Sequence, residues 1–81
     1  MIFDVLLFAA ARDLAGHSVC TVRVAEEATV SDLRSELIRT CPNLESMAKV
    51  LLVAVNNRYA GDLQVLHDGD SVACFPPVSG G

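Results

Sequence analysis

The first stretch of the chain alternates between two kinds of position. Over residues 2–8, every second side chain belongs to a wholly apolar set, Phe3, Val5 and Leu7. Side chains alternate across a strand, so we expect this set to face the core. The other set carries one charge but is otherwise more apolar than a solvated face requires. Its members are Ile2, Asp4, Leu6 and Phe8.

Three further strands are predicted, at residues 19–24, 50–55 and 71–75. The first of them alternates as residues 2–8 do. Residues 50–55 are apolar on both faces, which is typical of a strand in the interior of a sheet. The last strand follows Asp68-Gly69-Asp70, a sequence typical of a tight turn.

The segments between these strands are shorter or irregular. Residues 9–15 are rich in helix formers and are followed by Gly16, which predicts a short helix with a glycine C-cap. Asn56-Asn57 predicts a turn, because Asn tolerates left-handed backbone angles. Residues 58–66 are expected to be irregular, with a short strand near Tyr59.

The clearest helix begins after Thr29. Thr29 and Asp32 have the spacing of a capping box, with Asp in place of the commoner Glu. Pro42 ends the helix, and one further turn is expected over residues 43–49. An apolar stripe at helical spacing predicts the face that packs on the core. The stripe is Val30, Leu33, Leu37, Ile38 and Cys41; Arg34, Ser35, Glu36, Arg39 and Thr40 lie opposite.

This order of elements predicts an α+β domain over residues 1–75, with one sheet and one main helix across one of its faces. The other face of the sheet would then carry Leu6 and Phe8, with Phe75 nearby. An exposed apolar patch of this kind is typical of an interface. The alternative is that residues 58–66 fold over the patch and cover it.

The chain ends in a segment of a different character, predicted as an extended tail over residues 76–81. Pro76 and Pro77 fix φ and lack an N–H, so they leave the sheet. Gly80 and Gly81 have no Cβ and fit through a gap that a side chain would block. Fully extended, the tail reaches about 20 Å. These residues together predict a tail that inserts into another protein, although small residues are also common at ordinary flexible chain ends.

Composition narrows the classes of partner. The chain has 81 residues, of which 52% are apolar, as expected for one small folded domain. Six basic residues against ten acidic ones give a net charge of −4. A nucleic acid or an anionic membrane is therefore not expected as a partner. No apolar run approaches the length of a membrane span, and the N-terminal residues lack the positive region of a secretory signal.

The three cysteines, Cys20, Cys41 and Cys74, are odd in number and form no C-x-x-C. This pattern favours a reducing compartment such as the cytoplasm, with the thiols acting as small apolar residues. His17 and His67 stand far apart, and no spacing in the sequence offers four zinc ligands. We expect no metal site and no bound cofactor.

The sequence offers no nucleophile with a neighbouring base and no phosphate-binding loop. Asp68 and Asp70 flank a turn glycine and are read as turn residues. The remaining reactive group is the α-carboxylate of Gly81, which is ionised at neutral pH and must be activated before it reacts. A partner enzyme using ATP could form an acyl adenylate there. A sulfur donor could then displace AMP and leave a thiocarboxylate.

Four motifs together resemble a known family. They are residues 8–16 (FAAARDLAG), residues 53–56 (VAVN), the turn Asp68-Gly69-Asp70, and residues 75–81 (FPPVSGG). In order and spacing they resemble the small, sulfur-carrying subunit of molybdopterin synthase, a ubiquitin-like β-grasp sulfur carrier. The resemblance covers the whole chain, and its most specific part is the end.

The resemblance implies a sulfur-donating subunit that is not catalytic alone. An adenylyltransferase similar to the ubiquitin-activating enzymes would adenylate Gly81, and a sulfur donor protein would supply the sulfur. The tail would enter a large subunit and pass sulfur to cyclic pyranopterin monophosphate, in a heterotetramer of two small and two large subunits. Tail insertion would involve Pro76, Pro77, Val78, Ser79 and Gly80. The partner interface would involve Phe8, Phe75 and Arg12, which match positions of the family; Leu6 is added to it because it belongs to the expected apolar patch.

Three alternatives remain open. A sulfur carrier for thiamine thiazole synthesis would share the fold and the Gly-Gly end, although the Pro-Pro-Val-Ser approach favours molybdopterin. A ubiquitin-like modifier would be joined to lysines through Gly81. A β-grasp interaction module would have an inert tail. The resemblance assigns no residue to a role within residues 57–64.

Overall fold

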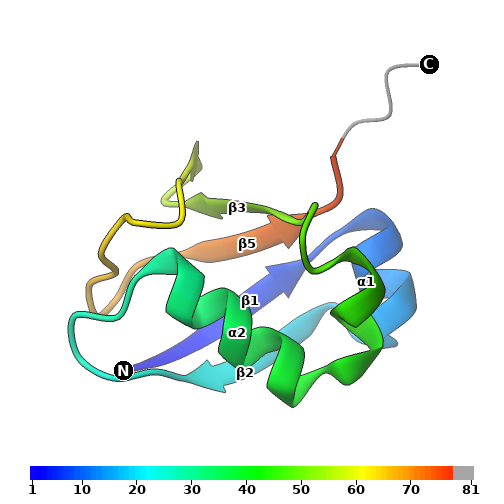
Figure 1. Cartoon of the computed structure of the whole chain (residues 1–81), viewed down its shortest axis with the longest axis horizontal. Helices are drawn as coiled ribbons and strands as arrows, with labels where there is room; N and C mark the ends of the chain where they lie inside the picture. The colour runs from blue at the N-terminus through cyan, green and yellow to red at the C-terminus, as the bar shows by residue number, and fades with distance from the viewer. Residues whose placement is uncertain (78–81) are drawn as a thin grey trace.

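The computed structural model describes residues 1–77 and shows one mixed sheet with the main helix across one face (Figure 1). Among these residues the sheet has five strands in the order β2-β1-β5-β3-β4. Strands β1 and β5 are parallel, and the other neighbours are antiparallel. The elements are β1 (Ile2–Leu7), α1 (Ala9–Ala15), β2 (Val19–Arg23), α2 (Val30–Thr40), the 3₁₀ helix η1 (Pro42–Met47), β3 (Leu52–Val55), β4 (Arg58–Tyr59) and β5 (Val72–Phe75).

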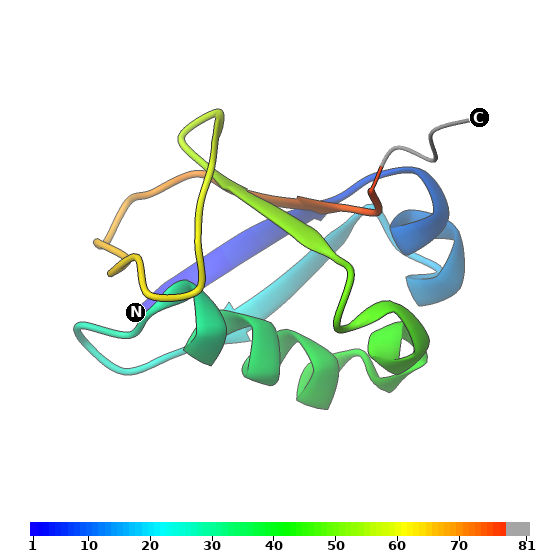
Figure 2. The same cartoon turned by 45° about the horizontal axis from the view of Figure 1, so that its top comes forward.

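The predicted α+β architecture is confirmed, and α2 lies beneath the sheet when the molecule is turned (Figure 2). The predictions made for Val78, Ser79, Gly80 and Gly81 lie outside the described residues. Of the tail, Pro76 and Pro77 are described: both follow β5 outside any strand. The division into a domain of residues 1–75 and a tail therefore stays a prediction.

The core lies between the sheet and α2. Phe3, Val5 and Leu7 are buried, as the alternation over β1 predicted. The apolar stripe of α2 meets them, with Val30, Leu33 and Leu37 fully buried and Ile38 and Cys41 partly buried against the same cluster. Completing the core are Ala11, Cys20, Val22, Val24, Ala28, Leu44, Leu51, Val53, Val55, Leu66, Val72 and Cys74.

The third strand begins later than the sequence indicated. Strand β3 starts at Leu52, and Val50 is exposed. The backbone N–H groups of Val50 and Leu51 both donate to the carbonyl of Met47, at 3.0 and 2.9 Å. Because these donors close the end of η1, they are not available to a neighbouring strand. The strand lies between β5 and β4, so its predicted interior position is confirmed.

Helix α2 begins at the predicted capping box. The Thr29 hydroxyl accepts from the Asp32 N–H at 3.3 Å, and the Asp32 carboxylate accepts from the Thr29 N–H at 2.9 Å. These bonds satisfy two of the N–H groups that a helix start leaves without partners.

Arg34 differs from its predicted place on the solvated side of α2. Its guanidinium donates to the carbonyls of Ala48 and Leu51 and to the carboxylate of Asp62. The side chain is 22% exposed, against 77% for Arg39. Arg34 therefore ties the helix to the residues before β3 and to the segment after β4. Spacing alone could not show this, because all three acceptors are distant in sequence.

A second polar cluster joins the β3–β4 turn to the start of β5. The Asp70 carboxylate accepts from the backbone N–H of His67 at 2.8 Å and from the Asn56 amide at 2.9 Å. The Asn56 amide oxygen in turn accepts from the N–H of Ser71 at 2.9 Å. The backbone bond from His67, followed by the amide bond from Asn56, lowers the pKa of Asp70 below its ordinary value.

We expect Arg34→Ala to lower the free energy of unfolding by about 2 kcal/mol. The partly buried carbonyls of Ala48 and Leu51 would lose their charged hydrogen-bond donor. The matched change on the same helix is Arg39→Ala, whose exposed ion pair with Glu36 should contribute less than about 0.5 kcal/mol. Urea unfolding of both variants checks this. Equal losses of unfolding free energy in the two variants would show that the hydrogen bonds of Arg34 do not stabilise the fold.

We expect the Asp70 cluster to make stability depend on acid pH. A carboxyl with a lowered folded pKa contributes stability above its unfolded value of 3.8, and this contribution is lost as pH falls through the folded pKa. The free energy of unfolding, measured with urea between about pH 6 and pH 2, should therefore decrease less steeply with falling pH for Asp70→Asn than for the parent. The control is Asp68→Asn, which removes an exposed carboxyl of the same turn that takes no part in the bonds joining His67, Asn56 and Ser71. A change of slope as large as that of Asp70→Asn would contradict the prediction.

Candidate functional site: the uncovered sheet face and the root of the tail

One row of side chains crosses the face of the sheet that α2 leaves open. Register pairs Leu6 with Ala73, Ala73 with Ala54, and Ala54 with Tyr59. Directly paired residues share a face, so the row runs through β1, β5, β3 and β4. Two alanines in its centre lie between larger side chains at either end. The row is therefore low in the middle.

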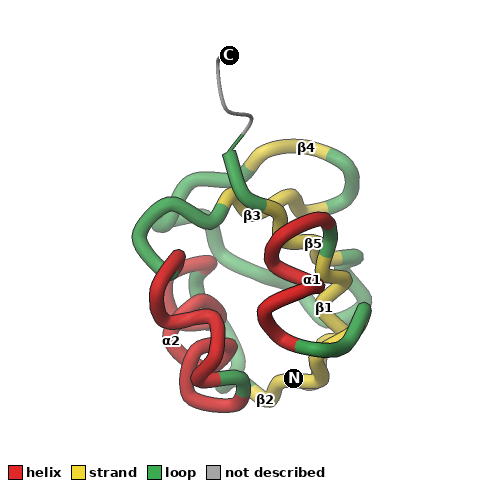
Figure 3. The backbone as a smooth tube through the Cα atoms, turned by 90° about the vertical axis from the view of Figure 1, so that its right-hand side faces the viewer, coloured by secondary structure: helices red, strands yellow, loops and turns green. Residues whose placement is uncertain are grey.

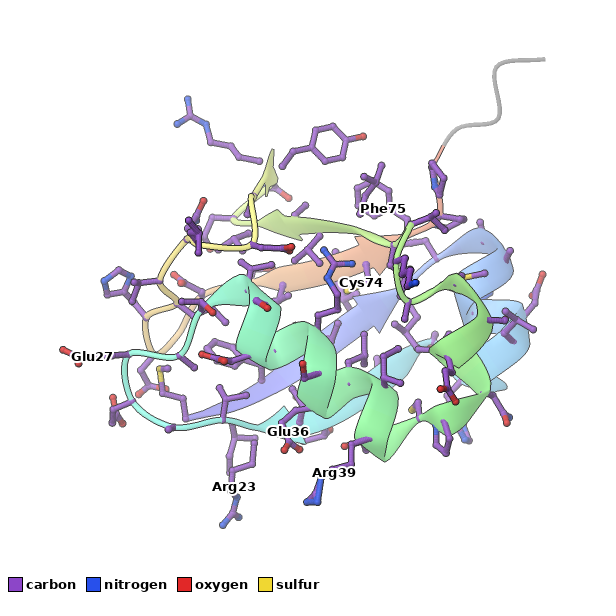
Figure 4. All side chains as sticks on the ribbon, viewed as in Figure 1. Arg23, Glu27, Glu36, Arg39, Cys74 and Phe75 are labelled. Atoms are coloured by element: carbon purple, nitrogen blue, oxygen red, sulfur yellow. The ribbon has the colours of Figure 1, made fainter. Side chains whose placement is uncertain are left out.

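Aromatic rings border this low centre. Phe75, at the end of β5, lies between Phe8 and Tyr59. Its ring centroid is 6.5 Å from that of Phe8, in an edge-on arrangement, and 5.5 Å from that of Tyr59. Such geometry is the favoured one for aromatic pairs. Figure 4 shows Phe75 at the point where the chain leaves the sheet.

The alanine floor and the aromatic border form an open hollow of about 330 Å³. The surrounding side chains are exposed: Leu6 by 39%, Phe8 by 48% and Tyr59 by 69%. The exposed apolar patch expected from the sequence is therefore present. Residues 58–66 do not cover it, although Tyr59 flanks one side. We call this surface the open face. It comprises Leu6 and the residues that line the hollow, which are Phe8, Ala54, Asn57, Tyr59, Ala73 and Phe75.

Phe8 is held on the open face by a sharp change of direction. It follows β1 as the N-cap of α1, and its N–H donates to the carbonyl of Cys74 at 3.1 Å. Ala9, the next residue, has a φ of +52°. This left-handed conformation costs a residue with a side chain roughly 1–2 kcal/mol. The bond to β5 and the start of α1 together fix the turn that presents Phe8.

Arg12 lies one helical turn beyond Phe8. Its backbone N–H donates to the Phe8 carbonyl at 3.4 Å. The side chain is 55% exposed, and its nearest charged neighbour is Asp13 at 4.0 Å. Arg12 therefore lies within one helical turn of Phe8, with a largely exposed guanidinium. Figure 3 shows α1 at the end of the sheet from which the chain continues toward the C-terminus.

The root of the tail adjoins the same surface. Phe75 is half-buried, Pro76 is half-buried and Pro77 is exposed. Of the residues predicted for tail insertion and sulfur attachment, Pro76 and Pro77 are described, and they follow directly after Phe75 of the open face. The predictions for residues 78–81 cannot be placed beside it.

Cys74, next to Phe75 in sequence, points the other way into the core and is fully buried. Burial raises the pKa of its thiol to about 11, an effect partly offset by the charge of Arg34. At neutral pH it is a buried thiol and no nucleophile for this surface. Within residues 1–77, no three His, Cys, Asp or Glu side chains gather where they could hold a metal ion. No helix in that part of the chain has the length and apolarity to cross a bilayer.

Four residues that line the hollow were assigned no role from the sequence: Ala54, Asn57, Tyr59 and Ala73. The sequence signal for Tyr59 is the predicted turn pair Asn56-Asn57. In the structure both residues have the positive φ, 52° and 68°, that a two-residue hairpin turn requires. Counting outward from that turn pairs Val55 with Arg58 and Ala54 with Tyr59. The short strand expected near Tyr59 is confirmed as β4, but the sequence did not show that it pairs with β3 and so did not place Tyr59 on the open face.

Known proteins resemble this chain over its full length. The sequence pattern of the ThiS family matches residues 5–81. The molybdopterin synthase sulfur carrier subunit of Chlamydomonas reinhardtii is 39% identical over 83 residues, covering 100% of both chains. The crystal structure of SAMP1 from Haloferax volcanii covers 100% of both chains, with a TM-score of 0.90 and 32% identity.

A third similarity is to a chain in the complex of subunits 1 and 2 of molybdopterin-converting factor from Helicobacter pylori. It covers 100% of both chains with a TM-score of 0.70, and at 23% identity it shows a shared fold. The predicted ubiquitin-like β-grasp fold is confirmed by the sheet order and by the match to SAMP1. With a family match over most of its length and a full-length homologue among the molybdopterin synthase sulfur carrier subunits, the chain belongs to the ThiS family.

Proposed function

We propose that this protein is a sulfur carrier that acts as the small subunit of molybdopterin synthase. The observation that carries the proposal is the full-length similarity to a sulfur carrier subunit, together with a family match that extends to Gly81. In this proposal the α-carboxylate of Gly81 is the group that is activated and loaded with sulfur. The protein donates sulfur within an assembly and does not act as a catalyst by itself.

The chemistry at Gly81 has two steps. A carboxylate oxygen attacks the α-phosphorus of ATP, pyrophosphate leaves, and an acyl adenylate forms. In the second step a persulfide sulfur of a donor protein attacks the acyl carbon and AMP leaves, which gives an acyl disulfide. A second thiol of the donor then cleaves the S–S bond, so that the thiocarboxylate is released and the donor keeps a disulfide. The adenylyltransferase binds the ATP, so the carrier itself holds no cofactor. The thiocarboxylate sulfur is a nucleophile toward cyclic pyranopterin monophosphate, and two transfers build the dithiolene of molybdopterin.

The open face supplies the docking surface in this proposal. Desolvating Leu6, Phe8 and Tyr59 against an apolar partner is favourable by about 25 cal/mol for each Å² removed from water. Contact with the large subunit there would direct the adjoining tail root, Pro76 and Pro77, into that partner. The Helicobacter pylori structure is described as a complex of subunit 1 with subunit 2, which supports a pairing of this kind.

A second candidate function is favoured by one observation. SAMP1 of Haloferax volcanii, described as a small archaeal modifier protein, has the same fold at 32% identity. In this alternative the activated Gly81 carbonyl is attacked by a lysine amine of another protein, and an isopeptide bond forms. The two functions share the adenylate and differ in the nucleophile that follows.

We expect the purified full-length chain to gain the mass of one oxygen-to-sulfur exchange when incubated with the adenylyltransferase, ATP and a persulfide sulfur donor. Intact-mass spectrometry with fragmentation should place the change on Gly81. A reaction without ATP and a variant lacking Gly80 and Gly81 are the controls, and neither should gain mass. Lysine conjugates in place of the thiocarboxylate would favour the modifier function.

We expect Leu6→Asp to weaken binding to the large subunit at least about tenfold, because it places a charge in the apolar contact. Tyr59→Ala should weaken binding in the same direction. Leu63→Asp is the matched control: Leu63 is 88% exposed in the segment between β4 and β5, away from the tail root in Figure 1. Calorimetric titration checks the dissociation constants. If Leu63→Asp weakens binding as much as Leu6→Asp does, the open face is not the docking surface.

A further inference from the structure

Two thiols from distant parts of the chain meet on the helix side of the sheet. The Sγ atoms of Cys20 and Cys41 lie 2.9 Å apart, although the residues are 21 positions apart in sequence. Cys20 belongs to β2, where it pairs with Val5 of β1. Cys41 is the C-cap of α2 and donates its backbone N–H to the Leu37 carbonyl at 2.8 Å. Each sulfur is therefore held by a regular element.

The two sulfurs differ in their access to solvent. Cys20 is 4% exposed, whereas Cys41 is only partly buried. Burial, followed by the bond and charge interaction with Cys41, raises the pKa of Cys20 to about 12, so Cys20 is a protonated thiol at neutral pH. A small oxidant from solvent thus meets Cys41 first, with Cys20 already in contact behind it.

We propose that Cys20 and Cys41 form an oxidisable pair, which a two-electron oxidant such as hydrogen peroxide converts into a disulfide within the chain. The Cys41 thiolate attacks one peroxide oxygen, the O–O bond breaks, and the sulfur becomes a sulfenic acid while hydroxide leaves. The Cys20 thiol, which is in contact with the Cys41 sulfur, then attacks it while its proton passes to the departing hydroxyl. The S–S bond forms, the S–O bond breaks, and the Cys20 proton leaves with the hydroxyl as water. Overall, two thiols and one peroxide give one disulfide and two waters.

Little movement is needed to form the bond. A disulfide joins its sulfurs at about 2.05 Å, so the two atoms must approach by less than about 1 Å. Cys41 is at the end of α2, where the helix stops and η1 begins. A helix end adjusts more readily than a strand within a sheet, so Cys41 is the side that shifts.

The cross-link would leave the open face unchanged. Cys20 and Val22 are the buried residues of β2, facing α2, while Val19 pairs with Leu6 on the opposite side of the sheet. The disulfide therefore joins β2 to α2 without touching Phe8, Phe75 or the tail root. It would strengthen the domain under oxidising stress while the terminus stays free to react. This inference does not depend on the proposed function.

The test uses the full chain, reduced and then treated with hydrogen peroxide. We expect the intact mass to fall by two hydrogens, and alkylation of the denatured product to label one thiol, Cys74. The midpoint of thermal unfolding, Tm, should rise on the order of 10 °C, because closing a loop of this length constrains the unfolded chain. Cys41→Ala and Cys20→Ala should abolish both effects, and the matched variant Cys74→Ala should retain them.

Three results would overturn the proposal. They are a disulfide that includes Cys74 or joins two molecules, oxidation of Cys41 to a sulfinic acid while Cys20 remains open to alkylation, and loss of two hydrogens with no rise in Tm. Cys41 is only partly buried, so we expect Cys41→Ala to fold. If Cys20→Ala fails to fold, Cys41→Ala still decides the test.

Discussion

A single long helix can cover only one face of a sheet, and this constraint organises the whole molecule. In the described part of the chain α2 buries the face that carries Phe3, Val5 and Leu7, and the core forms there. Within residues 1–77, no comparable element crosses the opposite face, which nevertheless carries Leu6 and Phe8. Exposing this apolar surface to water is unfavourable in free energy, and contact with a partner would remove it from water.

The same constraint separates folding from chemistry. Buried side chains stabilise the domain, and the residues of the open face are left free to recognise a partner. Among the described residues no three His, Cys, Asp or Glu side chains gather where they could hold a metal ion, and the thiol next to Phe75, that of Cys74, is buried. In the proposed function the reactive carbon belongs to the last residue, and partner proteins supply activation and catalysis. A small domain with 81 residues is sufficient for such a role because it must only fold, dock and present its end.

How far the sequence could predict this structure follows from the range of each interaction. The alternation over β1 and the capping box of α2 are local patterns, and both were predicted. Arg34 was misplaced because its acceptors, Ala48, Leu51 and Asp62, come near only when the chain has folded.

Long-range register explains the other differences. The position of Tyr59 beside Phe75 follows from the pairing of β4 with β3 and of β3 with β5. The contact between Cys20 and Cys41 requires the packing of α2 on β2. Leu6, Phe8 and Phe75 could be predicted together because strand alternation and proximity to the tail both point to the same surface.

The central claim is that the open face is where this protein meets its partner. The most direct measurement is methyl NMR of the labelled chain during titration with the large subunit. The account predicts shifts for the methyl groups of Leu6, Ala54 and Ala73, with Ile38 on α2 unchanged. Shifts concentrated at Ile38 and its neighbours, with the three open-face residues unchanged, would contradict it.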